Sequence, residues 1–248
     1  MDPTLMRFAD FLAAQLRQMQ PPEYNWGPRP LAVQVAWVPE HLRAGAKFER
    51  TDELLRLANE MICQAMSDGD DRALLDAVSV VMDWGGVWNE NSAKPIRKLV
   101  EAKTLCATLT NNLRALGTGD WPRMTLMNSG WSKVYAVLNP NRYVMYDSRV
   151  ARFLARQVVA WEAASLDPQQ EVRQMLRQTV SSRTQKPMKG YPKVEYSQKS
   201  AWAQSMVNAS DVLRMIVAGV AQRPEFRNTW LANLTLRELE ARVFMLGA

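Results

Sequence analysis

Apolar side chains recur every three or four residues over most of this 248-residue chain, which is the spacing of an amphipathic helix. Between residues 3 and 20, for example, Leu5, Phe8 and Leu12 share one helical face. The same spacing predicts helices over residues 51–67, 148–164, 169–180 and 199–222. We therefore expect an all-α fold of nine or ten helices without internal repeats.

Residues typical of helix ends predict where some of these helices begin. Asp70 is placed to cap another helix, and Pro95 is expected to open a long helix that continues to Leu116. Thr235 and Glu238 form the pattern of a capping box, which predicts that the last helix begins there.

Two stretches lack the helical spacing. Residues 21–50 are rich in proline, and apolar residues alternate with others from Leu31 to Trp37, which predicts one short strand. Residues 181–198 combine glycine and proline with charged residues, which predicts a loop.

The scarcity of cysteine and histidine excludes several kinds of site. The chain has two cysteines, Cys63 and Cys106, and a single histidine, His41. A four-cysteine zinc or iron–sulfur site and a three-histidine metal site are therefore impossible within one chain. A Ser-His-Asp triad would have to use His41, which has no nucleophile motif nearby. We expect no metal and no cofactor, so any chemistry falls to carboxylates, amines or binding alone.

The sequence also bears on location. The first residues, Met1-Asp2-Pro3-Thr4, are acidic where a secretory leader is basic, and no run of about 18 apolar residues occurs. Two well-separated cysteines are typical of reduced thiols. We expect a cytoplasmic protein with no membrane partner.

The positive charge is concentrated in one third of the chain. Residues 121–200 contain 13 Lys and Arg against 5 Asp and Glu, a balance of +8, within a chain of net charge +6. A basic segment on a near-neutral remainder favours a polyanion such as DNA as the partner, although a solvated surface gives the same composition. The predicted loop, residues 181–198, mixes lysines and an arginine with Tyr191 and Tyr196, which suits contacts to phosphates and bases.

Residues 121–152 have an unusual pattern. A short helix is expected first, then a tight turn at 128–130 and a second helix from Ser132 to Leu138. Asn139-Pro140-Asn141 ends that helix, and an extended stretch over 143–146 follows. Asp147 is then placed to cap the next helix.

This segment resembles the helix-hairpin-helix DNA glycosylases, and specifically bacterial proteins related to 8-oxoguanine DNA glycosylase. Lys133, near the start of the second helix, occupies the position of the family's lysine, and Asp147 occupies that of its aspartate. The hairpin of the family usually has two glycines, whereas this chain has only Gly130 within Asn128-Ser129-Gly130-Trp131. The resemblance implies a single helical domain over 1–248, with two helical lobes around a cleft, no N-terminal β-domain, and the catalytic segment at 121–152.

The resemblance also implies an activity, base excision from DNA with cleavage at the abasic site. The amine of Lys133 would attack C1′ of the deoxyribose and form a Schiff base, while the carboxylate of Asp147 would stabilise the oxocarbenium-like transition state. A flipped base would stack against Trp131 and Trp84. Residues expected to contact DNA are Asn128, Ser129, Gly130, Ser132, Arg149, Arg152, Arg183, Lys186 and Lys189.

Other interpretations remain open from the sequence. Asp147 could be only a helix cap, Lys133 only a solvated helix residue, and most of the nine tryptophans only core residues. The protein could be a non-catalytic module that binds nucleic acid. It could also be an antiviral defence factor of the same fold that acts on modified phage DNA or on nucleotides.

Overall fold

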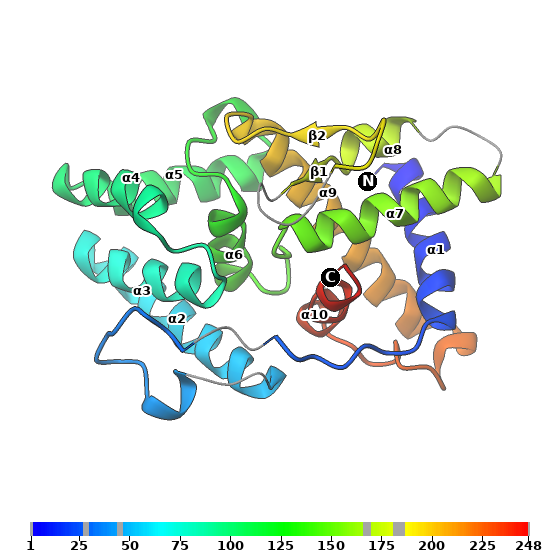
Figure 1. Cartoon of the computed structure of the whole chain (residues 1–248), viewed down its shortest axis with the longest axis horizontal. Coiled ribbons are helices and arrows are strands. Elements are labelled where there is room, and N and C mark those ends of the chain that lie inside the picture. The colour runs from blue at the N-terminus through cyan, green and yellow to red at the C-terminus, as the bar shows by residue number, and fades with distance from the viewer. Residues whose placement is uncertain (1, 27–29, 44–46, 166–169, 181–186, 248) are drawn as a thin grey trace. The chain divides into compact units, whose positions relative to one another are not determined.

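The computed structural model describes residues 2–26, 30–43, 47–165, 170–180 and 187–247. The chain divides into two compact units. Unit 1 contains Met1–Glu23 and Pro140–Ala248, so that both ends of the chain belong to it, and unit 2 is the continuous segment Tyr24–Asn139. Figure 1 gives the element labels used below.

Unit 2 is built from helices that pack in sequence order. Its helices are α2 (Phe48–Asp68), α3 (Asp71–Trp84), α4 (Glu90–Glu101), α5 (Leu105–Thr118) and α6 (Ser129–Leu138), with short 3-10 turns η1 (Glu40–Leu42) and η2 (Trp121–Arg123). Helix α3 is the centre of the unit, since it contacts α2, α4, α5 and α6. Nine of its residues, including Val78 and Met82, are buried, and Asp70 caps it as predicted.

The predicted long helix from Pro95 to Leu116 is wrong, because two helices occupy this stretch. Helix α4 already begins at Glu90 and ends at Glu101. Lys103 then adopts the left-handed conformation, with φ of 54°, which interrupts the helical hydrogen bonds. The carboxylate of Asp71, on α3, accepts hydrogen bonds from the backbone N–H groups of Leu105 and Cys106 and so starts α5. A cap from a distant helix leaves no local pattern in the sequence.

The strand predicted between Leu31 and Trp37 is absent, although these residues are described. The backbone N–H groups of Ala32 and Val33 donate instead to the buried carboxylate of Asp83 on α3, at 2.5 and 2.8 Å. Donors satisfied by a side chain are not available to a neighbouring strand.

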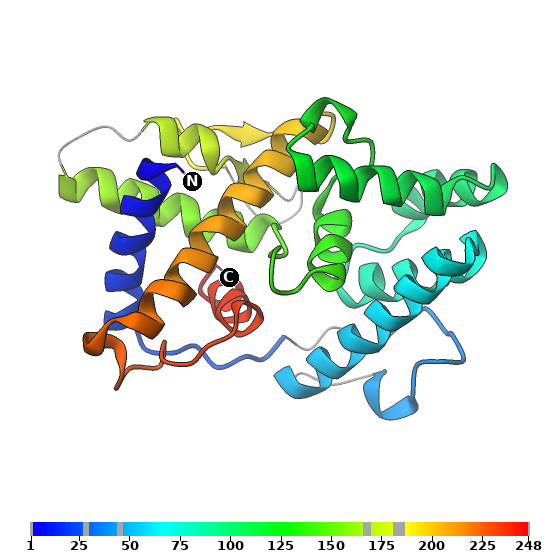
Figure 2. The same ribbon diagram turned by 180° about the vertical axis from the view of Figure 1, so that it is seen from behind.

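Unit 1 holds the remaining helices. They are α1 (Pro3–Gln18), α7 (Ser148–Ser165), α8 (Gln170–Met175), α9 (Lys199–Gln222) and α10 (Leu236–Leu246), with the 3-10 turn η3 (Pro224–Phe226). Figure 2 shows α1, in blue, beside α9, in orange, and the two helices are in contact. Helix α10 packs on both α7 and α9 and begins with the capping box predicted from Thr235 and Glu238.

A small sheet in unit 1 was not predicted. Strands β1 (Gln178–Thr179) and β2 (Lys193–Val194) pair in parallel, with Gln178 opposite Lys193. Helix α8 accordingly ends at Met175 instead of continuing to residue 180. Two-residue strands are too short to show an alternating pattern, so the sequence reveals only a loop here. The described residues nevertheless contain ten α-helices and only these two strands, which confirms the all-α class.

The described residues lack two further features. No helix among them is long and apolar enough to cross a membrane. No group of three His, Cys, Asp or Glu side chains within these ranges is arranged to hold a metal ion.

Cys106 is predicted to resist alkylation. Burial raises the pKa of its thiol to about 12, and the neighbouring Asp71 carboxylate, which forms a hydrogen bond with the thiol, contributes to the shift. Because the thiolate is the reactive form, Cys106 stays protonated and unreactive at pH 8. Treatment of the folded protein with iodoacetamide at pH 8, followed by peptide mass mapping, should modify the exposed Cys63 first. Equal modification of both cysteines would contradict the structure.

Candidate functional site

The backbone that leads into α6 is fixed by a buried asparagine of α5. The side-chain oxygen of Asn112, which is 1% exposed, accepts from the N–H groups of Thr125 and Leu126 at 2.8 and 2.9 Å. Its amide nitrogen donates to the carbonyl of Thr108 and to the hydroxyl of Thr125. Both lone pairs of the side-chain oxygen and both N–H donors of this amide are therefore used, which sets the path of residues 124–127.

A buried tyrosine holds the same segment from α6. The hydroxyl of Tyr135 donates to the carbonyl of Leu126 at 2.6 Å, so both backbone polar groups of Leu126 are bound by side chains. Burial raises the pKa of Tyr135 well above its ordinary value, and the phenol stays neutral. The connection between η2 and α6 is thus anchored by two side chains, Asn112 and Tyr135.

Helix α6 begins three residues earlier than predicted. Ser129 and Gly130 belong to its first turn, and Asn128 is its cap, with the side-chain oxygen accepting from the N–H groups of Gly130 and Trp131 at 2.8 and 3.0 Å. Ser132 is fully buried, and its hydroxyl donates to the carbonyl of Ser129. The N–H groups of Gly130 and Trp131 therefore already have an acceptor in Asn128, and contact of this helix start with DNA stays a prediction.

Lys133 is buried in unit 2. It is only 3% exposed, and its Nζ donates to the carbonyl of Ser129 one turn earlier, at 3.2 Å. Lysine is almost never fully buried without partners for its ammonium group, because removing that charge from water is costly. The interpretation of Lys133 as only a solvated helix residue is therefore wrong.

Gly85 provides the space that the lysine side chain occupies. A Cβ added at Gly85 would lie 2.4 Å from Cδ and 2.7 Å from Cε of Lys133. The backbone of Gly85 has φ of −74°, which any residue adopts, so the glycine is required by the close contact and not by its conformation. The end of α3 and the first turns of α6 together hold the amine.

Gly85→Ala should displace the lysine with little loss of stability. The added methyl group forces Cδ and Cε of Lys133 to move, and displacement of a reacting group by about 1 Å costs up to about 100-fold in rate. We expect the lyase activity implied by the resemblance to fall about 10- to 100-fold, and the free energy of unfolding to fall by about 1 kcal/mol. Strand-nicking rates and thermal melts measure the two effects.

Gly86→Ala is the matched control. Gly86 has φ of +69° but no atom within 4 Å of an added Cβ, so alanine there strains the backbone without touching Lys133. Activity lost to the same extent in both variants would show that the contact with Gly85 is not the cause.

Asp147 follows a buried segment in unit 1. Residues 143–146, which show no regular secondary structure, are all buried, as is Asp147 with 8% exposure. The N–H of Val144 donates to the hydroxyl of Ser210 at 3.0 Å, and the indole N–H of Trp202 donates to the carbonyl of Tyr146 at 3.2 Å. Ser210 and Trp202 both belong to α9, so one long helix holds this segment at two points.

The side chain of Asp147 caps α7 as predicted. Its Oδ1 accepts from the N–H groups of Arg149 and Val150 at 2.9 and 3.2 Å. A buried carboxylate at a helix N-terminus is stabilised by these bonds and by the helix dipole. The cap interpretation is thus confirmed, and it does not exclude a second role for the carboxylate.

The predicted DNA-contacting arginines of α7 are both half-buried. The guanidinium carbon of Arg149 lies 4.7 Å from the ring centre of Phe244 on α10, and its carbonyl is so close to Gly247 that no Cβ fits there. Arg149 therefore already contributes to packing within unit 1. A contact of Arg149 or Arg152 with DNA stays a prediction.

The two tryptophans predicted to line a base pocket are both buried in unit 2. Trp131 is 4% exposed and lies against the ring of Tyr135, with ring centres 6.3 Å apart, and Trp84 is 5% exposed. This burial is what the core interpretation expects. Contact of either ring with a base stays a prediction.

Of the three predicted DNA contacts in the loop 181–198, only one lies within the described residues. Lys189 is exposed in unit 1, whereas Arg183 and Lys186 lie outside the described residues. Lys133 belongs to unit 2 and Asp147 to unit 1, so each is described within its own unit, and their expected action at one cleft stays a prediction.

The comparisons with known proteins give no family assignment. No protein-family model matches the chain, and no curated protein or solved structure does.

Proposed function

We propose that this protein is a DNA glycosylase with lyase activity. The burial of Lys133 in a space left by Gly85 is the observation that carries the proposal. If position 133 only filled the core, an apolar side chain would be more stable there than lysine, because burial of a charged group is costly. A nucleophilic amine, by contrast, must be held in place and kept from bulk water. The buried carboxylate of Asp147 supplies the second group that the reaction requires.

In the proposed reaction, Nζ of Lys133 forms a bond to C1′ while the bond from C1′ to the base breaks. The base leaves with the electron pair of that bond and takes up a proton. The amine gives up two protons in all, one to the departing base and one to the ring oxygen as it leaves C1′, and an imine joins the lysine to the opened sugar. Loss of a proton from C2′ then forms a double bond between C2′ and C3′ and expels the phosphate from C3′, which cuts the strand. The carboxylate of Asp147 stabilises the positive charge that develops on the sugar.

Labelled DNA with an abasic site tests the lyase step without knowledge of the base. The full-length protein is expected to nick this DNA, and Lys133→Met should abolish nicking because methionine keeps an unbranched chain and removes the amine. Lys98→Met, on the exposed side of α4, is the matched control and should retain activity. Circular dichroism establishes that both variants are folded.

A panel of modified bases then tests the glycosylase step. Duplex and single-stranded DNA containing oxidised, alkylated, deaminated or glucosylated bases should include one substrate from which free base is released. DNA binding without release or nicking would reject the enzyme and favour a binding module. Protection of cells from phage by the wild type, lost in Asp147→Asn, would favour a defence role over repair.

A further inference from the structure

Tyr196 is the most exposed large hydrophobic side chain of the described residues. It is 73% exposed, whereas the next, Met6 and Val159, are 47% and 37% exposed. The other tyrosine of the same predicted loop, Tyr191, is buried, with its hydroxyl bonded to the carbonyl of Leu176. The sequence predicts the same role for both tyrosines, but the structure shows that of the two only Tyr196 is accessible to a partner.

The ring of Tyr196 is held in place even though it is exposed. Its centre lies 5.9 Å from the ring of the buried Trp202, at an angle of 80°. In such an edge-to-face pair, Trp202 covers at most one face of the tyrosine ring, so at least one face is not covered by it. A fixed aromatic face loses little conformational entropy when a planar group stacks on it.

The backbone on either side of Tyr196 is ordered by local hydrogen bonds. The N–H of Glu195 donates to the side-chain oxygen of Gln198, and the N–H of Gln198 donates to the carbonyl of Glu195, both at 2.9 Å. Helix α9 follows directly at Lys199. The tyrosine therefore projects from a closed turn at the start of a long helix.

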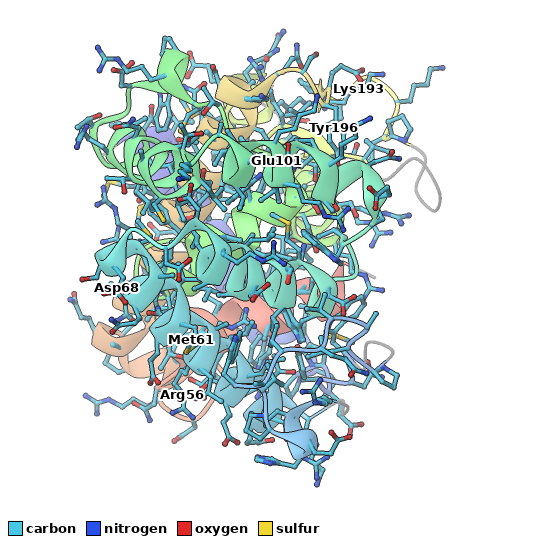
Figure 3. The ribbon with its side chains drawn as sticks, turned by 90° about the vertical axis from the view of Figure 1, so that its left-hand side faces the viewer. Arg56, Met61, Asp68, Glu101, Lys193 and Tyr196 are labelled. Carbon is cyan, nitrogen blue, oxygen red and sulfur yellow. The ribbon has the colours of Figure 1, made fainter. Side chains whose placement is uncertain are left out.

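The surroundings of Tyr196 are basic. The segment 187–199 contains three lysines, Lys189, Lys193 and Lys199, and one acid, Glu195, and all four side chains are exposed. Lys193 pairs with Glu195 at 2.7 Å, but both are more than half exposed, and such pairs contribute only about 0–1 kcal/mol. Figure 3 shows Lys193 and Tyr196 on the same face. A phosphate can therefore replace Glu195 as the partner of Lys193 at small cost.

We infer that Tyr196 is a stacking platform for an unpaired base of a nucleic-acid strand, with Lys193 and Lys199 contacting the adjacent phosphates. Fixed aromatic rings flanked by cations are the usual means of binding single strands without sequence preference. Trp202 links this platform to the proposed site, because its ring supports Tyr196 while its N–H binds the carbonyl next to Asp147. The inference shares the DNA partner of the proposed function but needs no catalysis.

Fluorescence anisotropy with labelled oligodeoxythymidine of 15 nucleotides tests the inference. Tyr196→Ala should weaken binding about 5- to 100-fold, and Tyr196→Phe should bind like the wild type, because the ring is what stacks. Met6→Ala, which removes another exposed apolar side chain of unit 1, is the matched control and should have no effect. Lys193→Gln and Lys199→Gln should each reduce the dependence of binding on salt by about one phosphate contact.

A backbone of 15 abasic sites separates stacking from charge. Tyr196→Ala should bind this strand as the wild type does, since no base is present to stack. The inference is overturned if the wild type binds neither strand, if Tyr196→Ala binds oligodeoxythymidine within about twofold of the wild type, or if it weakens both strands equally. Binding that depends on Tyr196 without nicking of abasic DNA would leave this inference standing and reject the lyase.

Discussion

Asp147→Asn is expected to reduce base release about 100- to 1,000-fold while leaving the fold intact. Asparagine is as good a helix cap as aspartate, so the bonds from the N–H groups of Arg149 and Val150 to Oδ1 are retained. The negative charge is lost, and with it the stabilisation of the developing positive charge on the sugar, which for a single electrostatic group is worth about this factor. Single-turnover rates on the substrate found in the panel measure the change.

Asp70→Asn is the control for the cap itself. Asp70 caps α3 through the N–H groups of Arg72 and Ala73 in the same way, but it is exposed and belongs to unit 2. Both variants lose the interaction of a carboxylate with a helix dipole, about 0.3–1 kcal/mol at an exposed site. If the rate of base release fell no more in Asp147→Asn than in Asp70→Asn, Asp147 would be only a structural cap.

Asn112→Ala is expected to have the largest effect on stability among the changes considered. It removes four hydrogen bonds of a buried side chain and leaves the N–H groups of Thr125 and Leu126 without that acceptor. Each such hydrogen bond contributes about 0.5–1.5 kcal/mol net, so we expect a loss of about 2–4 kcal/mol in unfolding free energy. For a chain of this size the melting temperature should fall by about 5–15 °C.

Two further variants test the cause of that loss. Asn112→Asp keeps the acceptor for Thr125 and Leu126 but places an oxygen instead of a donor against the carbonyl of Thr108, so it should also be less stable than the wild type. Asn111→Ala removes an exposed neighbour on the same helix and should change the unfolding free energy by less than about 0.5 kcal/mol. Urea unfolding provides the values, and a stability of Asn112→Ala within that range would refute the anchoring role.

The helices that were predicted correctly are those whose positions depend on residues close together in the sequence. Helix α9 occupies the predicted residues 199–222, and Asp147, Thr235 and Asp70 cap helices as expected. Each of these features depends on spacing or on a residue at the helix end, which the sequence shows directly.

The features that were missed depend on residues far apart in the chain. Asp83 binds the backbone of Ala32 and Val33, about 50 residues earlier, and removes the expected strand. Asp71 starts a helix at Leu105. No pattern in the neighbouring sequence predicts either contact, because the donors are backbone N–H groups, which every residue except proline carries.

The candidate site shows the same division. Lys133 and Asp147 were predicted from their positions in the chain, and the structure adds that both are buried. Asn112 and Trp202 were missed as supporting residues. The neighbouring glycines Gly85 and Gly86 mark a helix end in the sequence, but only the packing of α3 against α6 shows that one of them makes room for a lysine.

Borohydride trapping of the protein on abasic DNA is the most direct test of the proposed lysine chemistry. Borohydride reduces the imine to a secondary amine, which fixes the protein to the DNA. We expect a covalent complex in which peptide mapping places the sugar remnant on Lys133, and no complex with Lys133→Met. Strand nicking without a trapped complex, or a remnant on another amine, would contradict the assignment of Lys133 as the nucleophile.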